Sequence, residues 1–73
     1  MNLITANNHI GACSVCFNYD PATWESHFET QLWIKSRWDN GKVVNGYLKY
    51  YTFKTLKAAV NKFDELCEKH GIH

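Results

Sequence analysis

Residues 28–53 read FETQLWIKSRWDNGKVVNGYLKYYTF and contain the clearest structural signal in the chain. From Phe28 to Trp38, apolar and polar side chains alternate with a period of two, which is typical of a strand with one buried face. The pair Asn40-Gly41 follows, and both residue types readily adopt the positive φ angles of a tight hairpin turn. Residues 43–53 are rich in Val, Tyr and Thr, which favours a return strand. The stretch therefore predicts an antiparallel hairpin.

The register of this hairpin determines which side chains share a face. If Trp38 lies opposite Val43 in an uninterrupted ladder, Lys49 falls on the face of Leu32 and would be buried. We therefore expect a one-residue bulge at Asn45-Gly46, because glycine tolerates the left-handed conformation that a bulge requires. The predicted core face then holds Phe28, Leu32, Ile34, Trp38, Leu48 and Tyr50. The predicted open face holds Trp33, Lys35, Arg37, Tyr47, Lys49 and Tyr51.

A C-terminal helix is predicted over residues 56–70. Apolar side chains recur there at helical spacing, Thr55 can cap the first turn, and Gly71 can end the helix. Residues 12–19 alternate and form a third predicted strand. A helix over 21–37 competes with the strand from Phe28, but the alternation into the Asn-Gly turn is longer.

These elements predict one α+β domain over residues 1–73. Its sheet has three antiparallel strands within residues 12–53, and the helix 56–70 packs on one face. Residues 1–10 are expected to form an irregular or weakly paired arm. A chain of 73 residues is expected to form no second domain, and because it buries only about 60% of its unfolded surface its core is expected to be marginal.

Charge is distributed unevenly along the chain, although the formal net charge is only +1. Residues 1–34 contain three acids and no Lys or Arg, whereas residues 35–62 contain seven bases and one acid. Bases interleaved with aromatic rings suit nucleic acid, because cations neutralise phosphates and rings stack on bases. The residues expected to bind duplex DNA, through the sheet face and the hairpin tip, are Trp33, Lys35, Arg37, Asn40, Lys42, Tyr47, Lys49 and Tyr51.

A family resemblance is carried by Trp33-Ile34-Lys35, Gly41-Lys42, Tyr51-Thr52-Phe53-Lys54-Thr55, Ala58-Ala59 and Phe63. This pattern resembles the AP2-type DNA-binding domain and the related arm-binding domains of phage integrases. Those modules have three strands followed by one helix, and they read the major groove with the sheet. The resemblance therefore implies that Trp33, Lys35, Arg37, Tyr47 and Lys49 contact DNA.

A second function remains open, because Trp, Tyr and Arg are also the typical anchors of protein interfaces. On this alternative the chain is a small inhibitor or adaptor, of the kind that phages and mobile elements encode against host defence enzymes. No catalytic motif is present in the sequence, so we expect no enzyme. We expect a cytoplasmic protein without a membrane segment, and an exposed edge strand with an aromatic face would also allow a homodimer.

Cysteine spacing leaves a metal site as a further alternative. Cys13 and Cys16 form a Cys-x-x-Cys pair, and Cys67 and His70 form a Cys-x-x-His pair on the predicted helix. Together they could supply four ligands for a structural zinc ion. Strand alternation, however, sends Cys13 and Cys16 to opposite faces, so unrelated thiols and no cofactor are the favoured interpretation.

Overall fold

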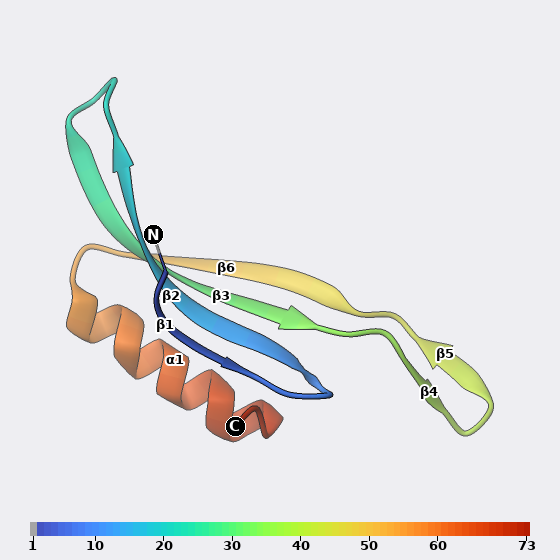
Figure 1. Cartoon of the computed structure of the whole chain (residues 1–73). Coiled ribbons are helices and arrows are strands. Elements are labelled where there is room, and N and C mark those ends of the chain that lie inside the picture. Colours follow the sequence, from blue (N-terminus) through green and yellow to red (C-terminus); the bar gives the residue numbers. More distant parts are fainter. Residues whose placement is uncertain (1) are drawn as a thin grey trace.

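The computed structural model of the chain describes residues 2–73. A four-stranded antiparallel sheet, ordered β1-β2-β3-β6, carries one helix, α1, on one face (Figure 1). The strands of this sheet are β1 (Asn2–Asn7), β2 (Gly11–Asp20), β3 (Glu25–Ile34) and β6 (Tyr47–Phe53). A separate antiparallel ribbon consists of β4 (Arg37–Asp39) and β5 (Lys42–Val44), and α1 spans Leu56–His70.

The α+β class with a C-terminal helix on an antiparallel sheet is confirmed, but the number of strands is four rather than three. Within the irregular or weakly paired arm predicted over residues 1–10, Asn2–Asn7 form a regular strand, β1, and Met1 lies outside the described residues. Strand β1 pairs with β2, and its register shifts between Asn2 and Ile4. Its side chains are mostly exposed, so it lacks the alternation that reveals a strand in sequence.

The helix begins and ends at the predicted residues. The Thr55 hydroxyl accepts a hydrogen bond from the backbone N–H of Ala58 at 3.3 Å. Gly71 ends the helix in the left-handed conformation, with φ at 66°. One face of α1 packs on the sheet and forms a single core of Cys13, Val15, Leu32, Ile34, Ala59, Phe63, Leu66, Cys67 and Ile72.

The bulge predicted at Asn45-Gly46 is absent. Trp38 pairs with Val43 in the ribbon and Ile34 pairs with Tyr47 in the sheet, so equal numbers of residues separate the two ladders on both strands. The uninterrupted register, with Lys49 opposite Leu32, is therefore the one adopted. Lys49 is nevertheless exposed, because β6 is an edge strand from which a long side chain reaches solvent.

Gly46 is needed for a different reason. A Cβ atom at this position would collide with the carbonyl oxygen of Ile34 and approach the backbone N of Ser36 to 2.8 Å. The Gly46 N–H also donates to the Ser36 hydroxyl at 3.0 Å. The glycine therefore allows a close crossing of two backbones between the sheet and the ribbon, without an inserted residue.

The molecule is long and thin, with extents of 49 × 23 × 14 Å. Strands β2 and β3 run beyond the core at one end, and the β4–β5 ribbon projects at the other (Figure 1). We call residues 18–27 the β2–β3 arm and residues 35–46 the β4–β5 arm. Within residues 2–73, no helix is long and apolar enough to cross a membrane.

Candidate functional site

The strand register divides the set of residues predicted to share the open face. Thr30 contacts Ala59 of α1, so Thr30 and its partner Tyr51 lie on the face that carries the helix, here called the helix face. Tyr47 and Lys49 share this helix face, because they oppose Ile34 and Leu32. Their predicted position on the open face is wrong, since no bulge reverses the alternation of β6.

Trp33 does lie on the open face, but its neighbours differ from those predicted. Its partner across β6 is Leu48, and Tyr50 follows on the same face opposite Gln31. Leu48 and Tyr50 were expected in the core, yet they are 50% and 58% exposed. We call Trp33, Leu48 and Tyr50 the aromatic patch. No motif in the sequence indicates this patch. Only the uninterrupted register, with Trp38 opposite Val43, places its three side chains on one face.

The rest of the open face is polar and centred on an acid. The carboxylate of Glu29 accepts hydrogen bonds from the Gln31 amide at 2.7 Å and the Asn18 amide at 3.4 Å. The His27 imidazole lies 3.8 Å from the same carboxylate. Residues 1–34 contain no Lys or Arg, and Lys49 faces the other side. Strands β2 and β3 therefore offer no Lys or Arg to a phosphate backbone on this part of the open face, and Lys54, just beyond β6, is the base that lies beside His27 and Thr52.

The basic residues of the predicted site lie instead on the β4–β5 arm. Arg37, Asn40 and Lys42 are all exposed there, and Lys42 lies opposite Asp39 in the β4–β5 ladder, next to the turn. Asn40 and Gly41 have φ angles of 52° and 78°, which confirms the predicted Asn-Gly turn.

Trp38 is the main aromatic residue of this arm. It was expected in the core and is 75% exposed instead. The physical reason is that the ribbon projects beyond the region covered by α1, so the alternation of β4 has no core to face.

Three lysines lie over aromatic rings. The ammonium groups of Lys35 and Lys49 lie 5.6 Å and 5.4 Å from the ring centroids of Trp33 and Tyr47. Lys62 of α1 lies 4.6 Å from the centroid of Tyr51 and makes an ion pair with Glu65. Lys62 was not among the predicted site residues, because only the packing of α1 on the sheet places it beside β6. The basic residues therefore continue from the β4–β5 arm along the helix face.

The four candidate zinc ligands do not come together. Cys13 and Cys67 meet in the core, whereas Cys16 lies opposite Glu29 and donates to the Asn2 side chain at 2.9 Å. Among residues 2–73, no three His, Cys, Asp or Glu side chains gather as metal ligands. Burial, together with the neighbouring Cys67, raises the pKa of the Cys13 thiol to about 12. A thiol held neutral in this way is a core residue rather than a nucleophile.

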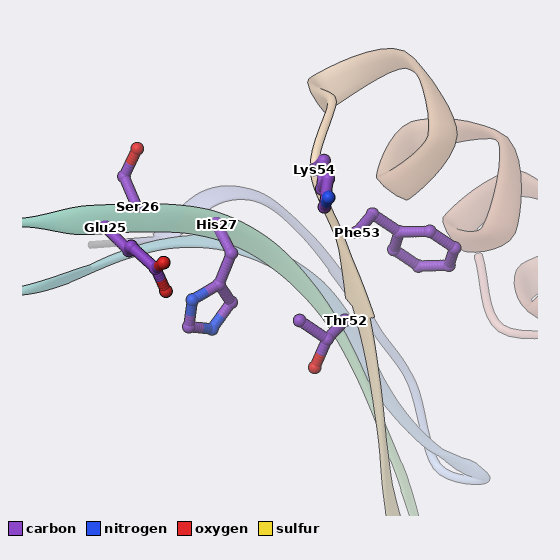
Figure 2. A pocket seen from close by; sticks show the side chains of 6 residues that line it. All are labelled: Glu25, Ser26, His27, Thr52, Phe53 and Lys54. Atoms are coloured by element: carbon purple, nitrogen blue, oxygen red, sulfur yellow. The ribbon is translucent and has the colours of Figure 1, made fainter. Parts of the chain in front are cut away.

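A shallow recess lies where β3 passes the end of β6. Figure 2 shows the side chains of His27 and Thr52 on the same side of their strands, while Phe53 points toward the helix. The recess also contains Glu25, Ser26 and Lys54, so acidic and basic groups are mixed in it. No part of this recess was predicted from the sequence, because it depends on where β6 ends against β3.

The structure thus separates three surfaces: the basic β4–β5 arm with its continuation on the helix face, the aromatic patch, and the polar part of the open face. Comparison of the chain with protein-family models, with curated proteins and with solved structures finds no significant match.

Proposed function

We propose that the protein is a non-enzymatic module that binds duplex nucleic acid through the β4–β5 arm. The observation that carries this proposal is the projection of an exposed ribbon that holds Arg37 and Lys42 clear of the body of the molecule, with Lys35 exposed at its root, where the Lys35 N–H donates to the Ile10 carbonyl (Figure 1). The major groove of duplex DNA is about 12 Å wide and admits a two-stranded ribbon. The arm thus has a suitable shape as well as a suitable charge.

The chemistry of the arm suits both parts of a duplex. Lysine and arginine neutralise phosphates, and the planar guanidinium of Arg37 can also bond a guanine edge with two parallel hydrogen bonds. Trp38 offers an exposed ring that can stack on a base or sugar. Lys49 extends the cationic surface from the root of the arm along β6.

The test is fluorescence anisotropy of a labelled generic duplex, titrated with protein at low and at physiological salt. Four cations on and beside the arm predict that log K falls with log salt with a slope of about −3.6, at about −0.9 per phosphate neutralised. The variant Lys35→Ala/Arg37→Ala should bind more weakly and with a shallower slope. The control Lys57→Ala/Lys69→Ala removes two exposed lysines from α1 and should bind like the wild type.

Two outcomes would contradict the proposal. The first is the absence of binding at low salt, where even a non-specific cationic surface retains affinity. The second is an equal loss of affinity in the arm variant and the α1 control, which would show that duplex affinity depends on the net charge of the protein and not on the position of the lysines and arginines.

A second candidate function is recognition of another protein, and the aromatic patch favours it. Trp33, Leu48 and Tyr50 are adjacent, exposed and apolar, and a contiguous apolar surface on a small protein commonly marks an interface. The partner would be the target of a small inhibitor or adaptor. Trp33→Ala/Tyr50→Ala should abolish salt-insensitive capture of such a partner in a pull-down, whereas Arg37→Ala/Lys42→Ala, on the ribbon, should leave it unchanged.

A further inference from the structure

The two arms carry opposite charges. The β2–β3 arm contains Asp20 and Glu25, both exposed, and no Lys or Arg, although Lys54 lines the recess beside Glu25 at the root of this arm. The β4–β5 arm contains Lys35, Arg37 and Lys42, all exposed, against the single acid Asp39. The molecule is therefore an elongated object, 49 Å long, with an acidic end and a basic end.

Each arm also exposes a tryptophan at its end. Trp24 is 82% exposed in the β2–β3 turn, where its backbone φ is 59° and its ring stacks edge-on against Tyr19 at 6.4 Å. Trp38 is 75% exposed on the β4–β5 arm. Exposed charge pairs alone contribute little to affinity, whereas large aromatic rings supply the apolar area that an interface needs.

We propose that two copies of this chain form a reciprocal antiparallel dimer, in which the β4–β5 arm of each copy lies against the β2–β3 arm of the other. Because the arms lie at opposite ends of one molecule, they cannot reach each other within a chain. An antiparallel arrangement of two copies places opposite charges together at both ends, and it has the closed two-fold symmetry that is commonest among homo-oligomers. A parallel arrangement would place like charges together instead.

The two contacts reinforce each other, because formation of the first makes the second effectively intramolecular. The dimer weakens with salt, since its charged contacts are exposed and the screening length falls to about 3 Å at 1 M salt. This inference is independent of the proposed nucleic-acid binding, although a duplex and a partner copy would compete for the same β4–β5 arm.

The test uses two full-length variants with complementary charge changes. One carries Asp20→Asn/Glu25→Lys on the β2–β3 arm. Asparagine keeps the side-chain oxygen that accepts a hydrogen bond from the Ala22 N–H at 2.9 Å, so the turn is preserved. The other variant carries Lys35→Glu/Arg37→Glu on the β4–β5 arm. Each variant alone brings like charges together at both contacts of a dimer, whereas a mixture restores opposite charges at both.

Sedimentation velocity and light scattering at low salt then measure the mass. We expect the wild type to approach twice its 8.5 kDa chain mass as concentration rises, and to return to a monomer at high salt. Each variant alone should remain monomeric, and the equimolar mixture should dimerise. The control Lys57→Glu/Lys69→Glu makes the same change of net charge as Lys35→Glu/Arg37→Glu, but on α1, and should dimerise like the wild type. Circular dichroism confirms that all variants are folded.

Three results would overturn the dimer. The wild type could remain monomeric at every concentration in low salt. It could grow beyond a dimer, which would show open chains instead of a closed pair. It could dimerise while the two variants fail to complement each other, which would place the interface elsewhere.

The Asp20→Asn/Glu25→Lys variant keeps its basic arm, so its duplex affinity should equal or exceed that of the wild type. Duplex binding by this variant reports on the proposed function separately.

Discussion

The hydroxyl of Thr30 donates a hydrogen bond to the backbone carbonyl of Ala59 at 2.8 Å, and both residues are fully buried. This contact joins the centre of β3 to the end of the first turn of α1. Within residues 2–73, Thr30 is the one polar residue buried in the core. Most of the remaining packing between helix and sheet is apolar and non-directional, so this bond helps to fix the position of the helix along the strand.

Replacement of Thr30 tests that role. Thr30→Val keeps the volume and removes the hydroxyl, so we expect the free energy of unfolding to fall by about 1 kcal/mol in urea denaturation. Thr30→Ser keeps the donor and loses a methyl group, so its cost comes from a small cavity. A Thr30→Val variant as stable as the wild type would show that the hydrogen bond contributes nothing net.

Much of the fold could be predicted because local signals agreed with it. The Asn40-Gly41 turn, the alternation from Phe28 to Ile34 and the capped helix each follow from a few adjacent residues. The register beyond Gly46 could not be settled in this way, because burial of Lys49 depends on whether an element covers its end of β6. The predicted bulge avoided burying a charge that the edge strand leaves exposed.

The candidate site was predicted less well for the same reason. An error of one position in β6 transfers every side chain to the other face, so Tyr47, Lys49 and Tyr51 separate from Trp33. Asn40 and Lys42 were placed correctly at an exposed hairpin tip, because the turn alone fixes them. Arg37 was expected on the open face of the sheet and lies instead on β4, in the separate ribbon. The position of Lys62 and the projection of the β2–β3 arm could not be predicted from the sequence. The first depends on how α1 packs on the sheet, and the second on how far β2 extends beyond the core.

Substitution of Leu48 separates the two registers experimentally. In the observed register Leu48 lies half exposed on the open face, so Leu48→Gln should change the free energy of unfolding by less than about 0.5 kcal/mol. Leu32, which is 1% exposed, serves as the buried reference, and Leu32→Ala should cost about 2–5 kcal/mol. A loss of several kcal/mol in Leu48→Gln would restore the bulged register.

Asn8 should be a sensitive position in the β1–β2 turn. Its side-chain oxygen accepts a hydrogen bond from the Ile10 N–H at 2.9 Å, and its amide donates to the Gly71 carbonyl at 2.7 Å. The residue therefore joins the turn to the end of α1, and Asn8→Ala should destabilise the protein by about 1–2 kcal/mol. The neighbouring exposed Asn7 is a matched control. Equal thermal stability of Asn8→Ala and Asn7→Ala would contradict this prediction.

The two glycines of the β4–β5 arm should respond differently to alanine. At Gly46 an added Cβ collides with the Ile34 carbonyl oxygen, so Gly46→Ala must displace the arm. At Gly41 nothing lies within 4 Å of an added Cβ, but φ is +78°. Gly41→Ala should therefore cost only the left-handed strain of about 1 kcal/mol. Amide exchange should show lost protection in β4 and β5 for Gly46→Ala, and preserved protection at the root of the arm for Gly41→Ala.

The buried thiols should make the protein less stable in alkaline solution. Burial raises the pKa of Cys13 from 9.0 to about 12, and burial also raises that of Cys67. A raised folded-state pKa means that the unfolded chain loses its thiol protons first. The stabilisation is therefore fully present below about pH 9 and is lost as pH rises toward 12. Within that window each such thiol lowers the free energy of unfolding by up to about 1.4 kcal/mol per pH unit.

Cys13→Ala deletes one of these groups, so its free energy of unfolding should fall less steeply than that of the wild type between pH 9 and 11, whatever its stability at pH 7. Parallel pH profiles for the two proteins would show that the Cys13 thiol ionises as easily in the fold as in the unfolded chain.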